Sequence, residues 1–188
     1  MGEPAQRRAT YDDLVAVPEH LVAEIIHGTL VTSPRPAPAH ALAASSLGMG
    51  LGSPFHHGRG GPGGWWILDE PELHLGPDVL VPDMAGWRRE RMPALPTTAY
   101  FELAPDWLCE VLSPSTEARD RTDKLEIYGR SGVPWVWFVN PERETLEILE
   151  RRDASWILRA TYRGDVVVRA HPFDAIELAL ADLWPPSS

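Results

Sequence analysis

Two uninterrupted apolar segments, joined by a stretch with a helical pattern, constrain the fold of this chain more than any other feature. Residues 106–112 (DWLCEVL) and 134–139 (PWVWFV) are apolar on both alternating faces, except at Glu110. Strands of this kind are usually buried in the centre of a sheet. Between them, the segment 113–116 (SPST) has the composition of a helix cap, and it predicts a helix over 117–130. The sequence therefore predicts a strand–helix–strand unit.

Shorter segments on either side of this unit have strand patterns. A β-hairpin is predicted over residues 21–26 and 29–32, with His27-Gly28 as its turn. The further predicted strands are 65–68, 72–75, 79–87, 145–151, 156–162 and 166–169, and an apolar segment over 176–183 closes the domain. We therefore expect a mixed α/β fold, in which a central mixed β-sheet is flanked by helices and antiparallel strands.

The chain of 188 residues has the length of one domain, which we assign to residues 10–185. Residues 1–9 are expected to form a flexible tail, followed by a short helix from Thr10 to about residue 17. A proline cluster precedes a second predicted helix over residues 40–49. Residues 48–64 contain eight glycines and are predicted to be a flexible loop.

The composition of the chain excludes several classes of protein. No apolar run approaches the roughly 18 residues needed to cross a bilayer, and no secretory signal is recognisable, so we expect a cytoplasmic protein with no membrane partner. The single cysteine, Cys109, excludes an internal disulfide framework and is expected to be a small buried side chain. A net charge of −10 argues against nonspecific coating of nucleic acid, although it leaves room for contacts made through metal ions.

Three acidic residues lie in apolar strand contexts: Glu24 in VAEII, Asp83 in VLVPDMA and Glu110 in WLCEVL. A buried carboxylate needs a cation, a hydrogen-bond network or a raised pKa. Each residue also has a plain alternative. Glu24 could face solvent, Asp83 could cap a turn after Pro82, and Glu110 could pair with a structural arginine.

The chain has 16 arginines and one lysine, Lys124. A compact ammonium can do work that the wide arginine fork cannot, which makes Lys124 a candidate functional residue. Asp120, Lys124 and Tyr128 are four residues apart and share one face of the predicted helix. The alternative is an exposed Asp120–Lys124 pair of little energetic value.

These residues lie in a recognisable pattern. The segments AEIIHGTL, PDVLVPDMAGW and PDWLCEVLSPSTEARDRTDKLEIYGRSGVPWVWFVNP closely resemble the Uma2 family of restriction-endonuclease-like proteins, over roughly residues 11–185. That family belongs to the PD-(D/E)xK nuclease superfamily. By this resemblance Asp83 and Glu110 match its two acidic positions, Lys124 matches the family's lysine, and Glu24 matches the hairpin glutamate. The superfamily usually has a lysine two residues after the second acid, whereas this chain has Leu112.

The resemblance implies a Mg²⁺-dependent endonuclease that hydrolyses phosphodiester bonds of DNA, with Mn²⁺ as a substitute. Asp83, Glu110 and the carbonyl of Val111 would hold the metal. Lys124 would orient water or stabilise the transition state, Glu24 would hold water or a second ion, and Asp120 would position Lys124. A homodimer is also implied.

The alternatives are a non-catalytic nuclease-fold binding or regulatory module, motivated by Leu112 and the acidic charge, and a metal-dependent hydrolase of another phosphodiester.

Other residues suggest nucleic-acid contacts less directly. The arginines that flank the predicted site could hold a phosphate backbone or could be scattered surface charge; they are Arg88, Arg89, Arg91, Arg119 and Arg121. The tryptophans at 65, 66 and 87 could stack on bases, although core filling is the simpler expectation. The pair His56-His57 is expected to lie in a solvent-exposed loop rather than to bind metal.

Overall fold

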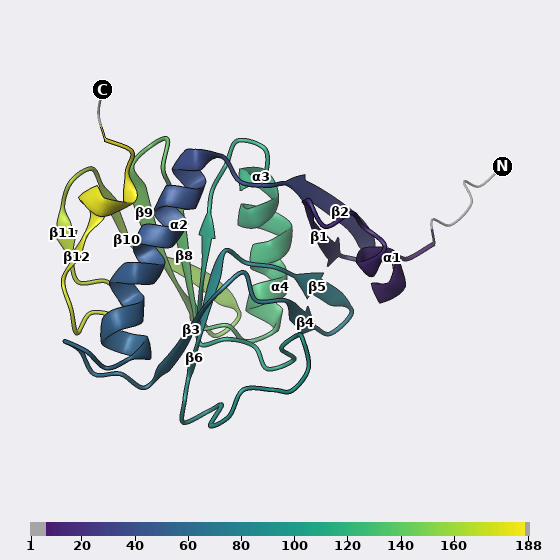
Figure 1. Cartoon of the computed structure of the whole chain (residues 1–188), viewed down its shortest axis with the longest axis horizontal. Coiled ribbons are helices and arrows are strands. Elements are labelled where there is room, and N and C mark those ends of the chain that lie inside the picture. Colours follow the sequence, from purple (N-terminus) through teal and green to yellow (C-terminus); the bar gives the residue numbers. More distant parts are fainter. Residues whose placement is uncertain (1–6, 187–188) are drawn as a thin grey trace.

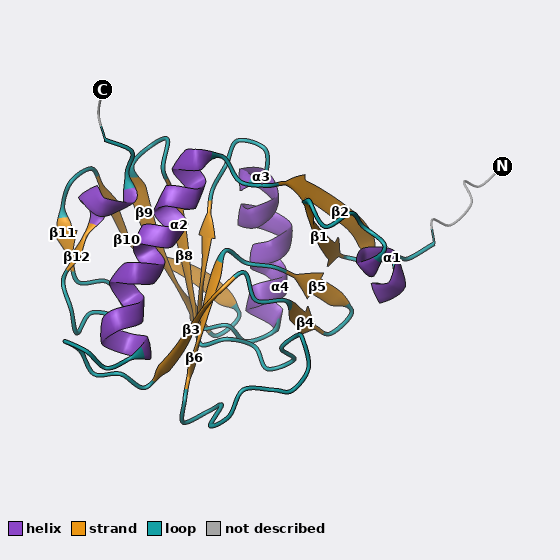
Figure 2. Cartoon of the chain, viewed as in Figure 1, coloured by secondary structure: helices purple, strands orange, loops and turns teal. Residues whose placement is uncertain are grey.

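A six-stranded mixed sheet forms the centre of the computed structural model, which describes residues 7–186 (Figures 1 and 2). Strands β7 and β8 are parallel, and every other neighbouring pair in this sheet is antiparallel. The strands, in spatial order, are β10 (Ser155–Arg163), β9 (Thr145–Arg152), β8 (Trp135–Asn140), β7 (Trp107–Val111), β6 (Met84–Arg88) and β3 (Trp65–Asp69). The predicted mixed α/β architecture is confirmed.

The connection between β7 and β8 is the predicted helix. It runs continuously through α3 (Glu117–Arg119), the π-helical turn η2 (Asp120–Lys124) and α4 (Leu125–Arg130). Single π-turns inside α-helices are frequent at functional sites. Here the turn begins and ends with the two charged residues that the sequence places on one helix face.

A second, smaller sheet lies beside the first, with strand order β2-β1-β5-β4. The predicted hairpin is confirmed as β1 (Leu21–Ile26) and β2 (Thr29–Pro34), and the left-handed backbone of His27 and Gly28 forms its turn. Strands β4 (Leu73–Leu75) and β5 (Asp78–Leu80) complete the sheet. The short helix α1 (Tyr11–Val15) precedes it, closed by a capping box between Thr10 and Asp13.

The predicted single strand over residues 79–87 is wrong. The chain instead leaves β5 in the small sheet and enters β6 in the large one, so Val81, Pro82 and Asp83 belong to neither. Proline has no N–H to donate to a strand ladder, which explains the break at this point. Asp83 consequently lies at the junction of the two sheets.

The predicted flexible loop over residues 48–64 is also partly wrong. Helix α2 (Pro38–Leu51) continues through the first glycines, and the π-helical turn η1 (Gly52–His56) extends it. The buried side chains of Leu47, Leu51 and Phe55 hold this segment against the sheet. At Gly50 a β-carbon would lie 3.2 Å from the side chain of Leu178, so the glycine permits a close approach. Packing therefore outweighs the low helix propensity of glycine.

The two faces of the large sheet carry separate cores. Helix α2 packs with Cys109 and Val111 on one face, and α4 packs with Leu108 and Leu112 on the other (Figure 1). This alternation along β7 is the predicted one. Near the carboxyl end, β11 (Val167–Val168), β12 (Leu178–Ala179) and the 3₁₀ turn η3 (Leu180–Leu183) cover the first core.

The predicted tail lies partly outside the described residues, which exclude 1–6. Within the described part, the backbone N–H of Ala9 donates to the carbonyl of Gly28 at 2.8 Å, so residues next to Thr10 contact the hairpin. Among the described residues, no helix is both long and apolar enough to span a membrane.

Candidate active site

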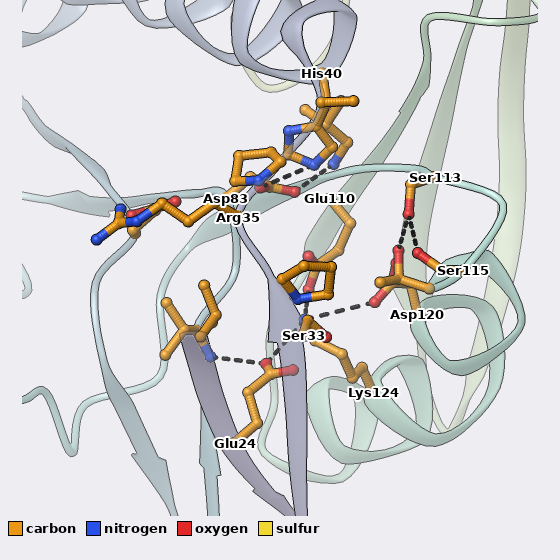
Figure 3. Close-up of a pocket in the computed structure, with 18 of the residues that line it drawn as sticks. Glu24, Ser33, Arg35, His40, Asp83, Glu110, Ser113, Ser115, Asp120 and Lys124 are labelled. Atoms are coloured by element: carbon orange, nitrogen blue, oxygen red, sulfur yellow. Dashed lines mark hydrogen bonds and ion pairs between the residues drawn. The ribbon is translucent and has the colours of Figure 1, made fainter. Parts of the chain in front are cut away.

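Lys124 is the centre of a buried ionic cluster. It enters from η2 with only 3% of its surface exposed. Its Nζ lies 2.8 Å from Oε1 of Glu110, 3.0 Å from Oε1 of Glu24 and 3.5 Å from Oδ1 of Asp120 (Figure 3). The alternative of an exposed Asp120–Lys124 pair is therefore wrong, because both side chains are buried and serve a larger network.

Glu110 is held from two sides at the same oxygen. It lies in β7, and its Oε1 forms an ion pair of 2.8 Å with Lys124 Nζ and accepts a hydrogen bond of 2.5 Å from the hydroxyl of Tyr128. The cation beside it is a lysine, not the structural arginine of the alternative. Neither contact uses Oε2. Burial is the main cause that raises the pKa of the Glu110 carboxyl well above its usual range.

Glu24 reaches the cluster from the small sheet. It is buried in β1, and its Oε1 accepts a hydrogen bond of 2.9 Å from the backbone N–H of Val81. The solvent-facing alternative for Glu24 is therefore wrong. The bond to Val81 also ties β1 to the segment that delivers Asp83 to the junction.

Asp83 caps the end of a strand rather than a turn. Its Oδ2 accepts a hydrogen bond of 2.7 Å from the backbone N–H of Val111, the last residue of β7. Because the N–H and C=O of one strand residue point to the same side, the carbonyl of Val111 also lies on the Asp83 side of β7. The second carboxylate oxygen, Oδ1, lies 3.2 Å from Nε2 of His40.

His40, near the start of α2, is a site residue that the sequence analysis missed. Its Nε2 lies 3.2 Å from Oδ1 of Asp83. Burial lowers the pKa of the imidazole, but Asp83 and Val111 outweigh burial and raise it. A histidine after a proline cluster carries no distinctive pattern, so only the three-dimensional arrangement reveals it.

The cluster has an excess of negative groups. Glu24, Glu110 and Asp120 surround the single ammonium of Lys124, and Asp83 lines the same cavity. Burial raises the pKa of Asp120 as well as that of Glu110, whereas the neighbouring carboxylates outweigh burial and raise the pKa of Lys124. The ammonium thus stays charged, and the surplus carboxylates favour a further cation.

These side chains line a cavity of about 330 Å³. Its remaining walls come from the β2–α2 connection and from the segment that caps α3. The lining residues are Val22, Glu24, Ser33, Pro34, Arg35, Pro36, Ala37, His40, Glu70, Val81, Asp83, Glu110, Val111, Ser113, Pro114, Ser115, Thr116, Asp120 and Lys124. Arg35 is the arginine of this lining, and none of the five candidate phosphate-binding arginines is among these residues.

Four of those five arginines have structural partners. Arg88 lies over the Trp65 ring, with its Cζ 4.7 Å from the ring centroid. Arg89 lies over the Trp66 ring and donates to the carbonyl of His56. Arg91 pairs with Asp106 at 2.7 Å. Arg121 pairs with Glu117 and Glu147 at 2.9 and 2.6 Å. For these four arginines, the interpretation as surface and structural charge is the better one.

Trp65, Trp87 and Cys109 follow their simpler expectations. Trp65 and Trp87 are buried in the two cores, and Cys109 is completely buried. The Nδ1 atom of His56 accepts a hydrogen bond of 3.2 Å from the backbone N–H of Ile67. Contrary to expectation, His56 is partly buried, and it lies in η1 rather than in a loop.

The site differs from a closed cage of metal-binding side chains. Within residues 7–186, no three His, Cys, Asp or Glu side chains are grouped so that they could hold a metal ion. Mg²⁺ does not require such a cage, because it usually binds one or two carboxylates and keeps several waters. The oxygen donors of Asp83, Glu110 and the Val111 carbonyl, together with the surplus negative charge, fit that pattern.

Comparison with known proteins now identifies the chain. The model of the Uma2 family, described as "Putative restriction endonuclease", matches residues 9–181. The chain belongs to the Uma2 family. A crystal structure of a putative nuclease belonging to DUF820, from Anabaena variabilis ATCC 29413, has a TM-score of 0.75 and 22% sequence identity, and covers 93% of this chain and 97% of that one. No curated protein matches.

The departure of this Uma2 chain at position 112 has a structural explanation. Leu112 is 2% exposed and packs in the core beneath α4 with Leu108 and Ile127. An ammonium still lies beside the strand carboxylate, because Nζ of Lys124, on the helix that covers the same face of the sheet, is 2.8 Å from Oε1 of Glu110.

Proposed function

We propose that this Uma2 protein is a Mg²⁺-dependent endonuclease that hydrolyses phosphodiester bonds of DNA. One observation carries the proposal: the buried ammonium of Lys124 lies between Glu110 and Glu24 at the wall of a cavity that Asp83 also lines. Burial of so many charges costs free energy, and clusters of this kind are found most often at functional sites. Membership of a family described as restriction endonucleases supports the same reading.

Asp83, Glu110 and the carbonyl of Val111 would hold the metal through hard oxygen donors, which both Mg²⁺ and Mn²⁺ accept. A bound divalent cation supplies Lewis acidity toward the phosphate and activates water for attack. The hydrogen bond from Val111 N–H fixes Oδ2 of Asp83, and the Tyr128 hydroxyl fixes Oε1 of Glu110. Both carboxylates are thus oriented before any ligand arrives.

Lys124 would act as a charged hydrogen-bond donor. Its raised pKa keeps Nζ protonated at neutral pH, so it is unsuited to accept a proton. A fixed ammonium at the cavity wall would stabilise negative charge that develops on a phosphate. Glu24 and Asp120 would hold this ammonium in place, each from a different element.

The direct test is cleavage of supercoiled plasmid, linear duplex and single-stranded DNA with Mg²⁺ or Mn²⁺. Asp83→Asn and Lys124→Met should lose activity by at least a hundredfold, whereas the exposed Asp182→Asn should retain it. Equal activity in wild type and the first two variants would mean contamination. Metal binding without cleavage of DNA would favour a regulatory module or a hydrolase of another phosphodiester.

The homodimer implied by the superfamily stays a prediction. Cleavage of both strands of a duplex by one site usually calls for two copies, and light scattering with and without a DNA duplex would measure the oligomeric state. A species of one chain mass under both conditions would contradict a dimer.

A further inference from the structure

Asp78 is a fully buried carboxylate that does not line the cavity. It begins β5 in the small sheet, which lies beside α4 (Figure 1). Its Oδ1 accepts a hydrogen bond of 2.7 Å from the backbone N–H of His27, in the turn between β1 and β2. Its Oδ2 pairs with the guanidinium of Arg130, the last residue of α4. One carboxylate thus joins the tip of the hairpin to the end of the helix that carries Lys124.

Glu24 makes the same two kinds of contact as Asp78. Its Oε1 accepts a hydrogen bond from the backbone N–H of Val81 and lies 3.0 Å from Nζ of Lys124. The two hydrogen bonds run in opposite directions between the hairpin and residues 78–81. Both carboxylates also bind a cation of the same helix, because Arg130 serves the outer one as Lys124 serves the inner one. The hairpin region and the helix are therefore joined at two points.

The spacing of the two points agrees on both sides. Arg130 follows Lys124 by six positions, which is about 9 Å along a helix axis. His27, which Asp78 binds, follows Glu24 by three positions, which is about 10 Å along an extended chain. The outer pair thus holds the hairpin at the height along the helix at which Glu24 meets Lys124.

We propose that Arg130 is a positioning residue for the proposed reaction and that it acts through Asp78. The pair holds the hairpin against the helix, and Glu24 therefore stays in contact with Lys124. The inference rests on the proposed function, because it concerns the ammonium that would stabilise charge on the phosphate. Neither member of the outer pair lines the cavity. A remote substitution can still matter, because a misplacement of about 1 Å in a catalytic group can lower a rate about a hundredfold.

The single lysine of the chain gives a readout without DNA. When the protein is labelled with ¹⁵N-lysine, NMR records one side-chain ammonium, that of Lys124, and the exchange of its protons with water. In Arg130→Met this exchange should be at least tenfold faster than in the wild type, and Glu24→Gln should show a similar increase. Arg143→Met, which breaks an exposed pair with Glu117, is the matched control and should leave the rate unchanged.

A double variant separates positioning from a general loss of stability. If Arg130 acts through the contact between Glu24 and Lys124, adding Arg130→Met to Glu24→Gln should raise the exchange rate less than threefold further. A merely structural role of Arg130 would raise the rate equally in both backgrounds. Asp78→Asn, whose Oδ1 can still accept the N–H of His27, serves as the second variant if Arg130→Met fails to fold.

Cleavage kinetics test the catalytic part of the inference. Arg130→Met should lower kcat at least tenfold and change KM less than threefold, because Arg130 does not line the cavity. Arg130→Lys, which can still pair with Asp78, should keep kcat within threefold of the wild type.

An unchanged exchange rate in a folded Arg130 variant, or equal effects of the substitution in both backgrounds, would overturn the inference. A higher KM with an unchanged kcat would also overturn it, because Arg130 would then act by binding DNA. Faster exchange that depends on Glu24, in a protein that cleaves no DNA, would support the positioning of Lys124 and would count against the proposed nuclease function alone.

Discussion

The Nζ atom of Lys124 lies 2.8 Å from Oε1 of Glu110, although the two residues belong to a helix and to the strand beneath it. Both side chains are almost completely buried. Removal of either member of this ion pair would destabilise the fold, because the other member would remain as an uncompensated buried charge. The two residues are therefore expected to depend on each other for their charged, buried state.

Removal of the ammonium should destabilise the fold. Lys124→Met leaves the carboxylates of Glu24, Glu110 and Asp120 without their shared cation, and we expect a loss of about 3–5 kcal/mol in the free energy of unfolding at neutral pH. Urea unfolding of the wild type and the variant measures this change in the free energy of unfolding. Arg152→Met, which breaks an exposed pair with Glu150, should cost no more than about 1 kcal/mol. Equal effects of the two substitutions would show that the buried cluster contributes no special stability.

A lysine at position 112 should not replace Lys124. In a Lys124→Met background, Leu112→Lys would put an ammonium into an apolar core, so we expect no return of DNA cleavage and a further loss of stability of about 2–5 kcal/mol. Cleavage assays and urea unfolding of the double variant check both statements. Recovery of activity to within tenfold of the wild type would show that position 112 can reach the site.

Arg35 should contribute to DNA binding more than the arginines singled out from the sequence. It is exposed, and its side chain lines the cavity. Arg35→Ala should reduce the slope of log affinity against log salt by about one, as expected for one lost phosphate contact. Fluorescence anisotropy in the cleavage-defective Asp83→Asn background measures it. The exposed Arg59→Ala, remote from the cavity, is the control; an equal change there would assign the effect to net charge.

Cys109 should be unreactive in the folded protein. It is completely buried in β7, and burial raises the pKa of its thiol well above the usual value. A thiol reagent such as dithionitrobenzoate should react with the native protein only as fast as it unfolds, and with the urea-unfolded chain at once. Rapid reaction under native conditions would contradict the packing of the central strand.

The regular elements were predictable because their patterns are local. The apolar runs of β7 and β8, the helix between them and the hairpin turn at His27-Gly28 all depend on neighbouring residues. The failures occurred where packing outweighs propensity. Glycines 48 and 50 remain helical because α2 packs closely on the sheet, and Pro82 divides one apparent strand between two sheets.

The candidate site divides in the same way. Glu24, Asp83, Glu110 and Lys124 were identifiable from the sequence, because a charge in an apolar context, or a lone lysine among arginines, stands out along the chain. His40 and Arg35 have no such contrast with their neighbours. Only the tertiary structure places them in the cavity, where α2 and the β2–α2 connection meet the ends of β6 and β7. The period of apolar residues, and a charged residue in an apolar segment, can be recognised from neighbouring residues in the sequence. Which side chains converge on one site depends on how the sheets and helices pack.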